Sequence, residues 1–398
     1  MKFAHISDCH LGAFRDGKLR ELNTKTFINA MDRCIEENVD FIIISGDLFH
    51  VNIPEMSITR TAVEKLREIK ENGIKVYVIY GSHDFSAGEV SMIDVLHAAG
   101  LFEKIMEVKE GDGIPKLKII FDKKTGAIIT GISGRKTGLE KSYYEFFDFK
   151  NFEEIAGYKI FVFHTAISEL KPTQIEACTP ISLFPKGIDY YAGGHIHYMI
   201  NTYIPNYGRI VYPGPLFASS YQDLELIANG INKCGFYIVE DGKQNFIELK
   251  EKDVELIEVN AGNRGAIEIN EELKIKIDRI DMNEKIILIK LWGEVEGKIR
   301  DINTELIQKR AQEIGAYAVY VNKNSLRSAD KRKVAVEAKT REELEEKIIR
   351  AHFSSKEINI FALLELLKTL KEEHKVGSKT DYENFLKKNA EKSFGIGI

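Results

Sequence analysis

Five short apolar segments in the first 200 residues each run into a group of aspartate or histidine residues. The segments are Lys2–Ser7, Val39–Ser45, Lys75–Tyr80, Lys159–His164 and Ile188–Gly194. Stretches with helical apolar spacing, at Leu22–Asn38 and Ile58–Asn72, separate the first three. This alternation predicts an α/β layered domain with a central sheet, and the near-continuous apolar strands predict burial of both sheet faces.

The residues that follow these strands are the candidates for chemistry. They are Asp8-Cys9-His10, Gly46-Asp47-Leu48-Phe49-His50, Gly81-Ser82-His83-Asp84, His164 and His195-Ile196-His197. Six of the ten histidines in the chain lie at these junctions. Because sites form at the carboxyl ends of strands in open α/β sheets, these side chains are expected to meet at one edge.

Aspartate and histidine together indicate a class of metal. Mixed oxygen and imidazole ligands suit Mn, Fe, Zn or Co better than Mg or Ca, and the lack of a thiolate cluster argues against a structural zinc site. Alternation along an extended chain predicts that Asp8 and His10 point to the same side, as do His195 and His197. With His164 these are more ligands than one ion needs, so we predict two ions about 3.5–4 Å apart, with Asp47 as the bridge.

Other histidines and cysteines have simpler explanations. His5 lies inside the first strand and is predicted to be a core histidine with its hydrogen bonds satisfied, and Cys9 is predicted to pack away from the metals. His97 falls in a helical stretch without a site pattern. The four cysteines form no CxxC pair, which predicts free thiols in a reducing cytoplasm.

Composition is typical of a soluble globular protein, with 44% hydrophobic and 29% charged residues. The sequence contains no apolar run of about 18 residues, so no membrane helix is predicted. The start MKFAHISD does not resemble a signal peptide. We therefore expect a cytoplasmic protein without membrane contact. The net charge of −5 means that nucleic acid would have to bind through a local patch or through metals.

We predict three domains: a core at 1–250, a small α+β module at 251–330 and a helical tail at 331–398. In the module, Leu273–Asp278, Lys285–Val295 and Ala316–Lys323 are predicted strands, and Asn303–Ile314 a helix. Three capping boxes punctuate the tail, at Thr340–Glu343, Ser354–Glu357 and Thr380–Glu383. The stretch Ile358–Leu370 is apolar nearly all round, which indicates either a local helical hairpin or a docking surface for a partner.

The order DxH, GDLFH, GxHD, a lone histidine after a strand, and GHIH resembles the calcineurin-type metallophosphoesterase superfamily over residues 1–240. Within it, the chain is most similar to the SbcD/Mre-eleven kind of double-strand-break-repair nuclease. The histidine after Phe49, the segment IVYPGPLFASSYQD and the closing strand CGFYIVE carry this narrower resemblance, together with the module and tail that follow. This resemblance implies a layered α-β-β-α sandwich with a capping domain and a helical tail.

The resemblance also implies roles for single residues. One metal would be held by Asp8, His10, Asp47 and His197, and the second by Asp47, Ser82, His164 and His195. His83 would be the catalytic histidine, Asp84 would orient it, and His50 would face the DNA. The family has asparagine at the position of Ser82, so the second ion is expected to be held less tightly here.

The implied function is a DNA exonuclease and endonuclease that uses two Mn²⁺ ions, or other divalent transition metals, on double-strand-break ends, hairpins and single-strand tails. The tail would dock to a coiled-coil ATPase of the SbcC/Rad-fifty kind. A homodimer would form through Ile58–Asn72 and Glu89–Leu101, and the apolar residues of the second segment are Val90, Ile93, Val95, Leu96 and Leu101. Two alternatives are a phosphoesterase for small phosphoesters or cyclic nucleotides, and a non-catalytic DNA-end-binding scaffold.

Overall fold

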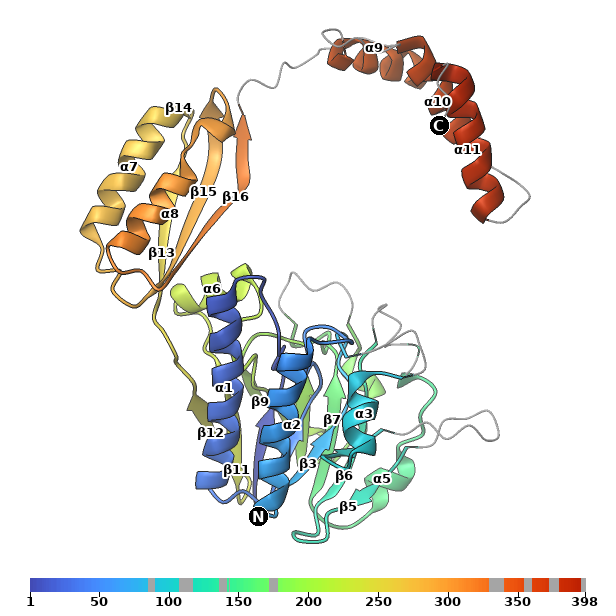
Figure 1. Cartoon of the computed structure of the whole chain (residues 1–398). Helices are drawn as coiled ribbons and strands as arrows, with labels where there is room; N and C mark the ends of the chain where they lie inside the picture. Colours follow the sequence, from blue (N-terminus) through green and yellow to red (C-terminus); the bar gives the residue numbers. More distant parts are fainter. Residues whose placement is uncertain are drawn as a thin grey trace. The chain divides into compact units, whose positions relative to one another are not determined.

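The structure is a computed structural model that describes residues 1–84, 90–106, 117–135, 142, 144–171, 178–328, 340–353, 360–371 and 379–394 (Figure 1). The chain forms two compact units, Met1–Arg327 and Ser328–Ile398. The predicted boundary near residue 331 lies outside the described residues, and the one near residue 250 lies between the strands β12 and β13. These domain boundaries therefore stay predictions.

Two six-stranded sheets form the centre of the first unit. The first has the order β12 (Lys243–Glu248), β11 (Gly235–Glu240), β1 (Lys2–Ile6), β2 (Phe41–Ile44), β3 (Lys75–Val78) and β4 (Glu103–Lys104). The second has the order β5 (Ile120–Phe121), β6 (Ile128–Ile132), β7 (Lys159–His164), β8 (Tyr190–Gly194), β10 (Gly208–Tyr212) and β9 (Ile200–Ile204). Strands β1 to β4 are parallel to one another, and so are β6, β7, β8 and β10.

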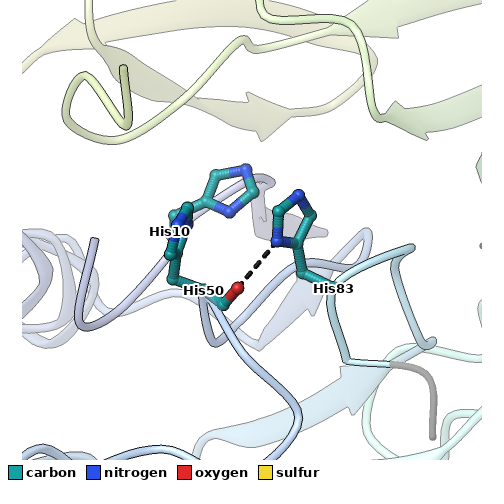
Figure 2. Close-up of side chains that lie close together, drawn as sticks. All are labelled: His10, His50 and His83. Atoms are coloured by element: carbon teal, nitrogen blue, oxygen red, sulfur yellow. Dashed lines mark hydrogen bonds between the residues drawn. The ribbon is translucent and has the colours of Figure 1, made fainter. Parts of the chain in front are cut away.

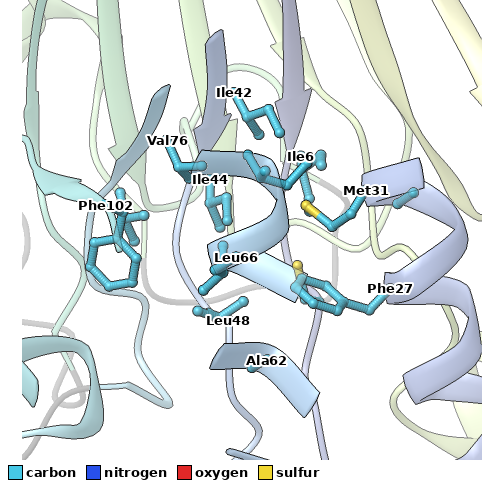
Figure 3. Close-up of a cluster of buried hydrophobic side chains, with 14 of the residues drawn as sticks. Ile6, Phe27, Met31, Ile42, Ile44, Leu48, Ala62, Leu66, Val76 and Phe102 are labelled. Atoms are coloured by element: carbon cyan, nitrogen blue, oxygen red, sulfur yellow. The ribbon is translucent and has the colours of Figure 1, made fainter. Parts of the chain in front are cut away.

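Helices cover the outer face of the first sheet. α1 (Gly17–Glu36) and α2 (Met56–Glu71) pack side by side there, and α3 (Met92–Ala98) adds Ile93 and Leu96 to the same core (Figure 1). Figure 3 shows Phe27 and Met31 of α1 and Leu66 of α2 against the sheet residues of this core. Phe27 and Met31 are four residues apart, as are Ala62 and Leu66 of α2, which is the spacing of an amphipathic helix.

Alternation along β2 explains why its sequence is apolar throughout. Ile42 and Ile44 face the helices, whereas Phe41 and Ile43 face the second sheet. In the second sheet, Val162 of β7 faces the first sheet and Phe161 faces the outer core. That outer core includes Phe152 of the helix α5 (Lys150–Glu154) and Ile181 of the 3₁₀ helix η1 (Ile181–Leu183). The predicted α-β-β-α layered fold is confirmed.

The small module contains a four-stranded sheet, two α-helices and a 3₁₀ helix. Its strands are β13 (Val254–Asn260), β14 (Arg264–Gly265), β15 (Ile286–Glu296) and β16 (Ala318–Ser328), and its helices are α7 (Ala266–Arg279), the 3₁₀ helix η2 (Ile299–Asp301) and α8 (Thr304–Glu313). The predicted strand at Leu273–Asp278 is wrong, since this segment is the end of α7. Leu273 and Ile277 are buried one helical turn apart, whereas Ile275 between them is exposed.

One apolar cluster joins the module to the core. Leu19 and Leu22 of α1 and Leu224 of α6 (Tyr221–Ala228) lie in it with Ile286 and Leu288 of β15. Polar contacts reinforce this junction: the Lys18 ammonium donates to the Tyr317 carbonyl at 2.6 Å, and Lys290 pairs with Glu225. The module is therefore packed on α1 and α6.

The second unit is helical, as predicted. It contains α9 (Arg341–Phe353), α10 (Ile360–Lys371) and α11 (Lys379–Phe394), and α10 packs against both neighbours. The Glu343 N–H donates to the Thr340 hydroxyl at 3.2 Å, as the first capping box predicts; the second box, Ser354–Glu357, lies outside the described residues. Within the part of the chain that the structure describes, no helix is long and apolar enough to cross a membrane.

Candidate metal centre

The ends of five parallel strands from both sheets meet at one place. Loops after β1 and β2 are tied together, because the N–H of Asp8 donates to the Gly46 carbonyl at 3.2 Å and that of His10 to the Asp47 carbonyl at 2.9 Å. From the second sheet, the backbone N–H of His195 donates to both carboxylate oxygens of Asp8, at 3.1 and 3.2 Å. The site therefore spans the carboxyl edges of the two sheets, as the sequence predicted for one sheet.

Four of the candidate ligands have a left-handed backbone. Their φ angles are 50° at Asp8, 43° at His10, 51° at Asp47 and 83° at His195. Asp8 and His10 do lie together, as predicted, but the expected reason, an extended chain, is wrong, since β1 ends at Ile6. Tight turns, rather than strand alternation, bring these side chains together, and such strained residues concentrate at functional sites.

Gly81 is required by a close approach. A Cβ atom at this position would lie 2.0 Å from the Asp47 Oδ1 atom. The missing side chain lets the Asp47 carboxylate reach the loop after β3, where it accepts from the backbone N–H of His83 at 2.7 Å. The same carboxylate accepts from the Ser82 hydroxyl at 3.3 Å.

Among the described residues, three groups of ligand atoms share this space, and two of them contain aspartate. In the first, Asp8, His10 and His197 bring one atom each to within 4.8 Å of one another, and in the second Asp8, Asp47 and His164 do so. The Asp47 Oδ2 atom lies 3.7 Å from His10 Nε2 and 3.3 Å from His164 Nε2. Asp47 is thus placed between the groups, as a bridging carboxylate would be.

The hydrogen bonds of the histidines show that a cation fits. His164 Nδ1 donates to the Ser45 carbonyl at 2.8 Å, so its Nε2 atom points at Asp47 and has no hydrogen-bond partner among the described residues. His197 Nδ1 is bonded to Asp223 at 3.1 Å, and its Nε2 atom lies 3.1 Å from His10 Nε2. Imidazole nitrogens and carboxylates that converge in this way suit a divalent transition-metal ion.

Electrostatics agree with this arrangement. Burial lowers the pKa of His164, but the Asp47 and Asp8 carboxylates and the hydrogen bond to Ser45 together raise it to about 9. Burial likewise lowers the pKa of His197, and the hydrogen bond to Asp223 raises it to about 9. In both cases the surrounding carboxylates attract positive charge to a buried nitrogen, and a bound cation supplies that charge.

His195 lies next to the second group. Its ring packs against that of His164, with 5.2 Å between ring centroids. Burial, followed by the charge of His164, lowers the pKa of His195 to about 4. Its imidazole is therefore neutral near pH 7, which is the form that binds a metal.

Three histidine rings line the site (Figure 2). The His83 ring lies 4.8 Å from that of His10 and 5.0 Å from that of His50, between ring centroids. His83 Nδ1 donates to the backbone carbonyl of His50 at 2.7 Å. This bond fixes the ring and directs the Nε2 atom away from the His50 carbonyl.

Asp84 does not orient His83, which corrects the role that the sequence implied. Its buried carboxylate accepts from the backbone N–H groups of Leu48, Phe49 and Gly81, at 3.2, 3.1 and 3.0 Å. Asp84 therefore joins the loop after β2 to the loop after β3. The carbonyl of His50 takes the role predicted for Asp84.

Two functional candidates were missed. Asp223 contacts the ring of His197, and Asn232 donates to the His197 carbonyl at 2.5 Å while accepting from the Met199 N–H at 3.1 Å. The sequence does contain a signal for Asp223, since Ser220 and Asp223 form a capping box. That pattern predicts a helix start and gives no reason to connect Asp223 with His197.

The predictions for His5, Cys9 and His97 agree with the structure. His5 is fully buried, and its two ring nitrogens lie 2.9 Å from the Tyr190 and Ser45 hydroxyls. Cys9 lies in the core between the first sheet and its helices. His97 lies in α3, where its Nδ1 atom is 3.0 Å from the Phe102 carbonyl oxygen.

Comparison with known proteins gives the family. The model of the calcineurin-like phosphoesterase family matches residues 1–199. The "DNA double-strand break repair protein Mre11" of Methanocaldococcus jannaschii is 30% identical over 314 residues, which cover 75% of this chain and 77% of that protein. The protein of the same name from Sulfurisphaera tokodaii is 27% identical over 84% of both chains.

Other relatives are matched over a smaller part of their length. The Mre11 protein of Archaeoglobus fulgidus is 26% identical over 279 residues, 65% of this chain and 61% of that protein. The match covers 57% of the Methanopyrus kandleri protein and 52% of the Methanococcus maripaludis protein. The fold, the metal-ligand groups and the family match agree. The chain therefore belongs to the calcineurin-like phosphoesterase family, among the relatives of the archaeal Mre11 proteins.

Proposed function

We propose that this chain is a Mn²⁺-dependent DNA nuclease that cuts as an exonuclease and an endonuclease at double-strand-break ends. The observation that carries the proposal is the position of Asp47 between two groups of ligands, with the His83 ring at the same space. Relatives named for double-strand break repair support DNA as the substrate.

The ligands divide between two ions around Asp47. Asp8, His10 and His197 would hold one with Asp47, and His164, His195 and Ser82 would hold the other with Asp47. When bound, such ions supply neutralisation of the phosphodiester and activation of a water nucleophile. Asp8 also fixes the backbone of His195, so one carboxylate organises residues from both sheets.

His83 is suited to handle the proton of the leaving oxygen. Because its Nδ1 atom donates to the His50 carbonyl, its Nε2 atom is left for a phosphodiester oxygen. The ring is half-buried, so a substrate can reach it. The His50 ring stacks on that of His83, and His50 would face the DNA.

We assign proposed partners to the other parts of the chain. The module at 251–330 would shape the DNA groove, and the tail helices would dock to a Rad-fifty-like coiled-coil ATPase. A homodimer would use the surface next to α2 and α3, where Ile53, Met56, Val90 and Val95 are exposed. Hairpins and single-strand tails are the other expected DNA substrates.

A nuclease assay tests the proposal. Linear duplex and hairpin DNA are incubated with the protein and Mn²⁺, and His83→Ala is the matched control. We expect cleavage by the wild type and cleavage about 10²–10⁴-fold slower in the variant, with Mn²⁺ binding and melting temperature retained. Hydrolysis of small phosphoesters without cleavage of DNA would contradict the proposal, and so would metal-loaded protein that is inert to both.

A further inference from the structure

Asp223 lies at the start of α6 and has two sets of contacts. Its Oδ2 atom accepts from the backbone N–H of Ser219 at 2.9 Å and of Ser220 at 3.1 Å, and from the Ser219 hydroxyl at 3.0 Å. Both carboxylate oxygens also lie 3.1 Å from Nδ1 of His197, 26 residues earlier. The side chain is 6% exposed, so its position is fixed by these contacts.

This carboxylate determines how His197 presents its ring. With Nδ1–H donating to Asp223, the other nitrogen is directed at the candidate metal centre. That Nε2 atom lies 3.1 Å from His10 Nε2 and 3.9 Å from Asp8 Oδ1. Histidine ligands whose second nitrogen is held by a carboxylate keep one orientation and bind metals more tightly.

The backbone of His197 is held by Asn232, which follows the C-terminal end of α6. Asn232, which is buried, donates to the His197 carbonyl and accepts from the Met199 N–H. α6 itself is fixed between core and module, because Leu224 is in their shared apolar cluster and Glu225 pairs with Lys290. The carboxylate is therefore presented from a rigid element.

We propose that Asp223 is a positioning residue for His197, which fixes the orientation and the protonated nitrogen of this ring for metal binding. The expected effect on metal binding rests on the proposed metal centre. The role of Asp223 goes beyond that proposal, because this residue is not one of the proposed ligands.

The test compares Asp223→Asn with Ser220→Ala. The asparagine keeps the size of the side chain but removes its charge. The alanine removes the hydroxyl that accepts from the Asp223 N–H at 3.1 Å but leaves the carboxylate in place. Circular dichroism and melting temperature establish that each variant is folded, and Asp223→Ala serves as a second variant if the asparagine disturbs α6.

The first measurement is the proton NMR spectrum of metal-free protein. An imidazole N–H bonded to a carboxylate gives a far-downfield resonance, which His197→Ala assigns by its loss. We expect the resonance in the wild type and in Ser220→Ala, and its absence in Asp223→Asn. A resonance that persists in Asp223→Asn would overturn the inference.

The second measurement is Mn²⁺ affinity, from the electron paramagnetic resonance signal of free Mn²⁺. We expect Asp223→Asn to weaken one ion by about 10–100-fold and Ser220→Ala to leave affinity unchanged. Adding Asp223→Asn to His197→Ala should produce no further loss, since the two act through one ring. Unchanged affinity in Asp223→Asn, or full additivity, would overturn the inference. Wild-type protein that binds no Mn²⁺ would refute the proposed metal centre instead, and the NMR result would then decide the inference about Asp223.

Discussion

At the scale of residues, the candidate centre is held in a strained backbone. Left-handed conformations at residues with a Cβ atom cost on the order of 1–3 kcal/mol each, and here Asp8, His10, Asp47 and His195 adopt them. Hydrogen bonds between the loops stabilise this geometry, above all those of the Asp84 carboxylate to three backbone N–H groups. The ligands are therefore already assembled by the protein.

Ser82 provides a direct test of the second group of ligands. Its hydroxyl donates to Asp47, and an asparagine carbonyl would reach farther toward a metal. We predict that Ser82→Asn lowers the Mn²⁺ concentration for half-maximal nuclease activity by about tenfold, equivalent to about 1.4 kcal/mol of binding free energy. Ser82→Ala is the control and should raise that concentration or leave it the same. An unchanged Mn²⁺ dependence in Ser82→Asn would refute the role of this position.

His5 predicts a pH dependence of stability. Burial lowers its pKa to about 3, whereas an unfolded histidine titrates near 6.5. Between these values the unfolded state binds the extra proton, so the free energy of unfolding falls as pH decreases from about 6.5 toward 3, by up to about 1.4 kcal/mol per pH unit. Urea unfolding of metal-free protein should show a shallower decrease in His5→Gln than in the wild type. Parallel pH curves for the two proteins would show that His5 makes no such contribution.

Most candidate site residues could be predicted, because they directly follow apolar strands. Asp223 and the true role of Asp84 could not. Both depend on contacts between loops that are distant in sequence, and a capping pattern such as that of Ser220 and Asp223 is explained by the local helix alone.

At the scale of elements, the strands after which the ligands lie were predicted to within about two residues, because continuous apolar runs are distinctive. The segment Leu273–Asp278 was predicted wrongly. Its apolar residues Leu273, Ile275 and Ile277 alternate as in a strand, but Leu273 and Ile277 also match one face of a helix. Its burial was decided by packing on the module sheet. Local periodicity carries no information on that packing.

The tail helix α10 has both a buried and an exposed apolar residue. Ala362 is buried, with 1% exposure, whereas the neighbouring Phe361 is 72% exposed. We predict that Phe361→Glu weakens binding to the Rad-fifty-like ATPase by about tenfold or more, since exposed aromatic anchors dominate many interfaces. Calorimetric titration measures the affinity for the ATPase. Phe121→Glu is the control, since Phe121 is an exposed phenylalanine of the first unit. Equal affinity of Phe361→Glu and wild type would contradict a docking role for this residue.

At the scale of the whole molecule, the structure narrows the proposed dimer surface. Of the predicted apolar residues around α3, Ile93 and Leu96 are buried in the core, whereas Val90 and Val95 are 65% and 50% exposed. We predict that Val95→Asp shifts the dimer to a monomer, because a charge would be buried in the interface. Light scattering after size-exclusion chromatography measures this. Phe121→Asp should remain dimeric, and a dimeric Val95→Asp protein would contradict the assignment.

The number of Mn²⁺ ions bound per chain, measured by equilibrium titration, tests the central claim most directly. Asp47 Oδ2 lies 3.7 Å from His10 Nε2 and 3.3 Å from His164 Nε2, so both ions should depend on this carboxylate. We predict two ions in the wild type, weakened binding of both in Asp47→Asn, and two ions in the control Asp241→Asn, whose carboxylate is exposed and pairs with the N-terminus. A wild type that binds a single ion or none, or an Asp47→Asn variant that binds both ions normally, would contradict the account.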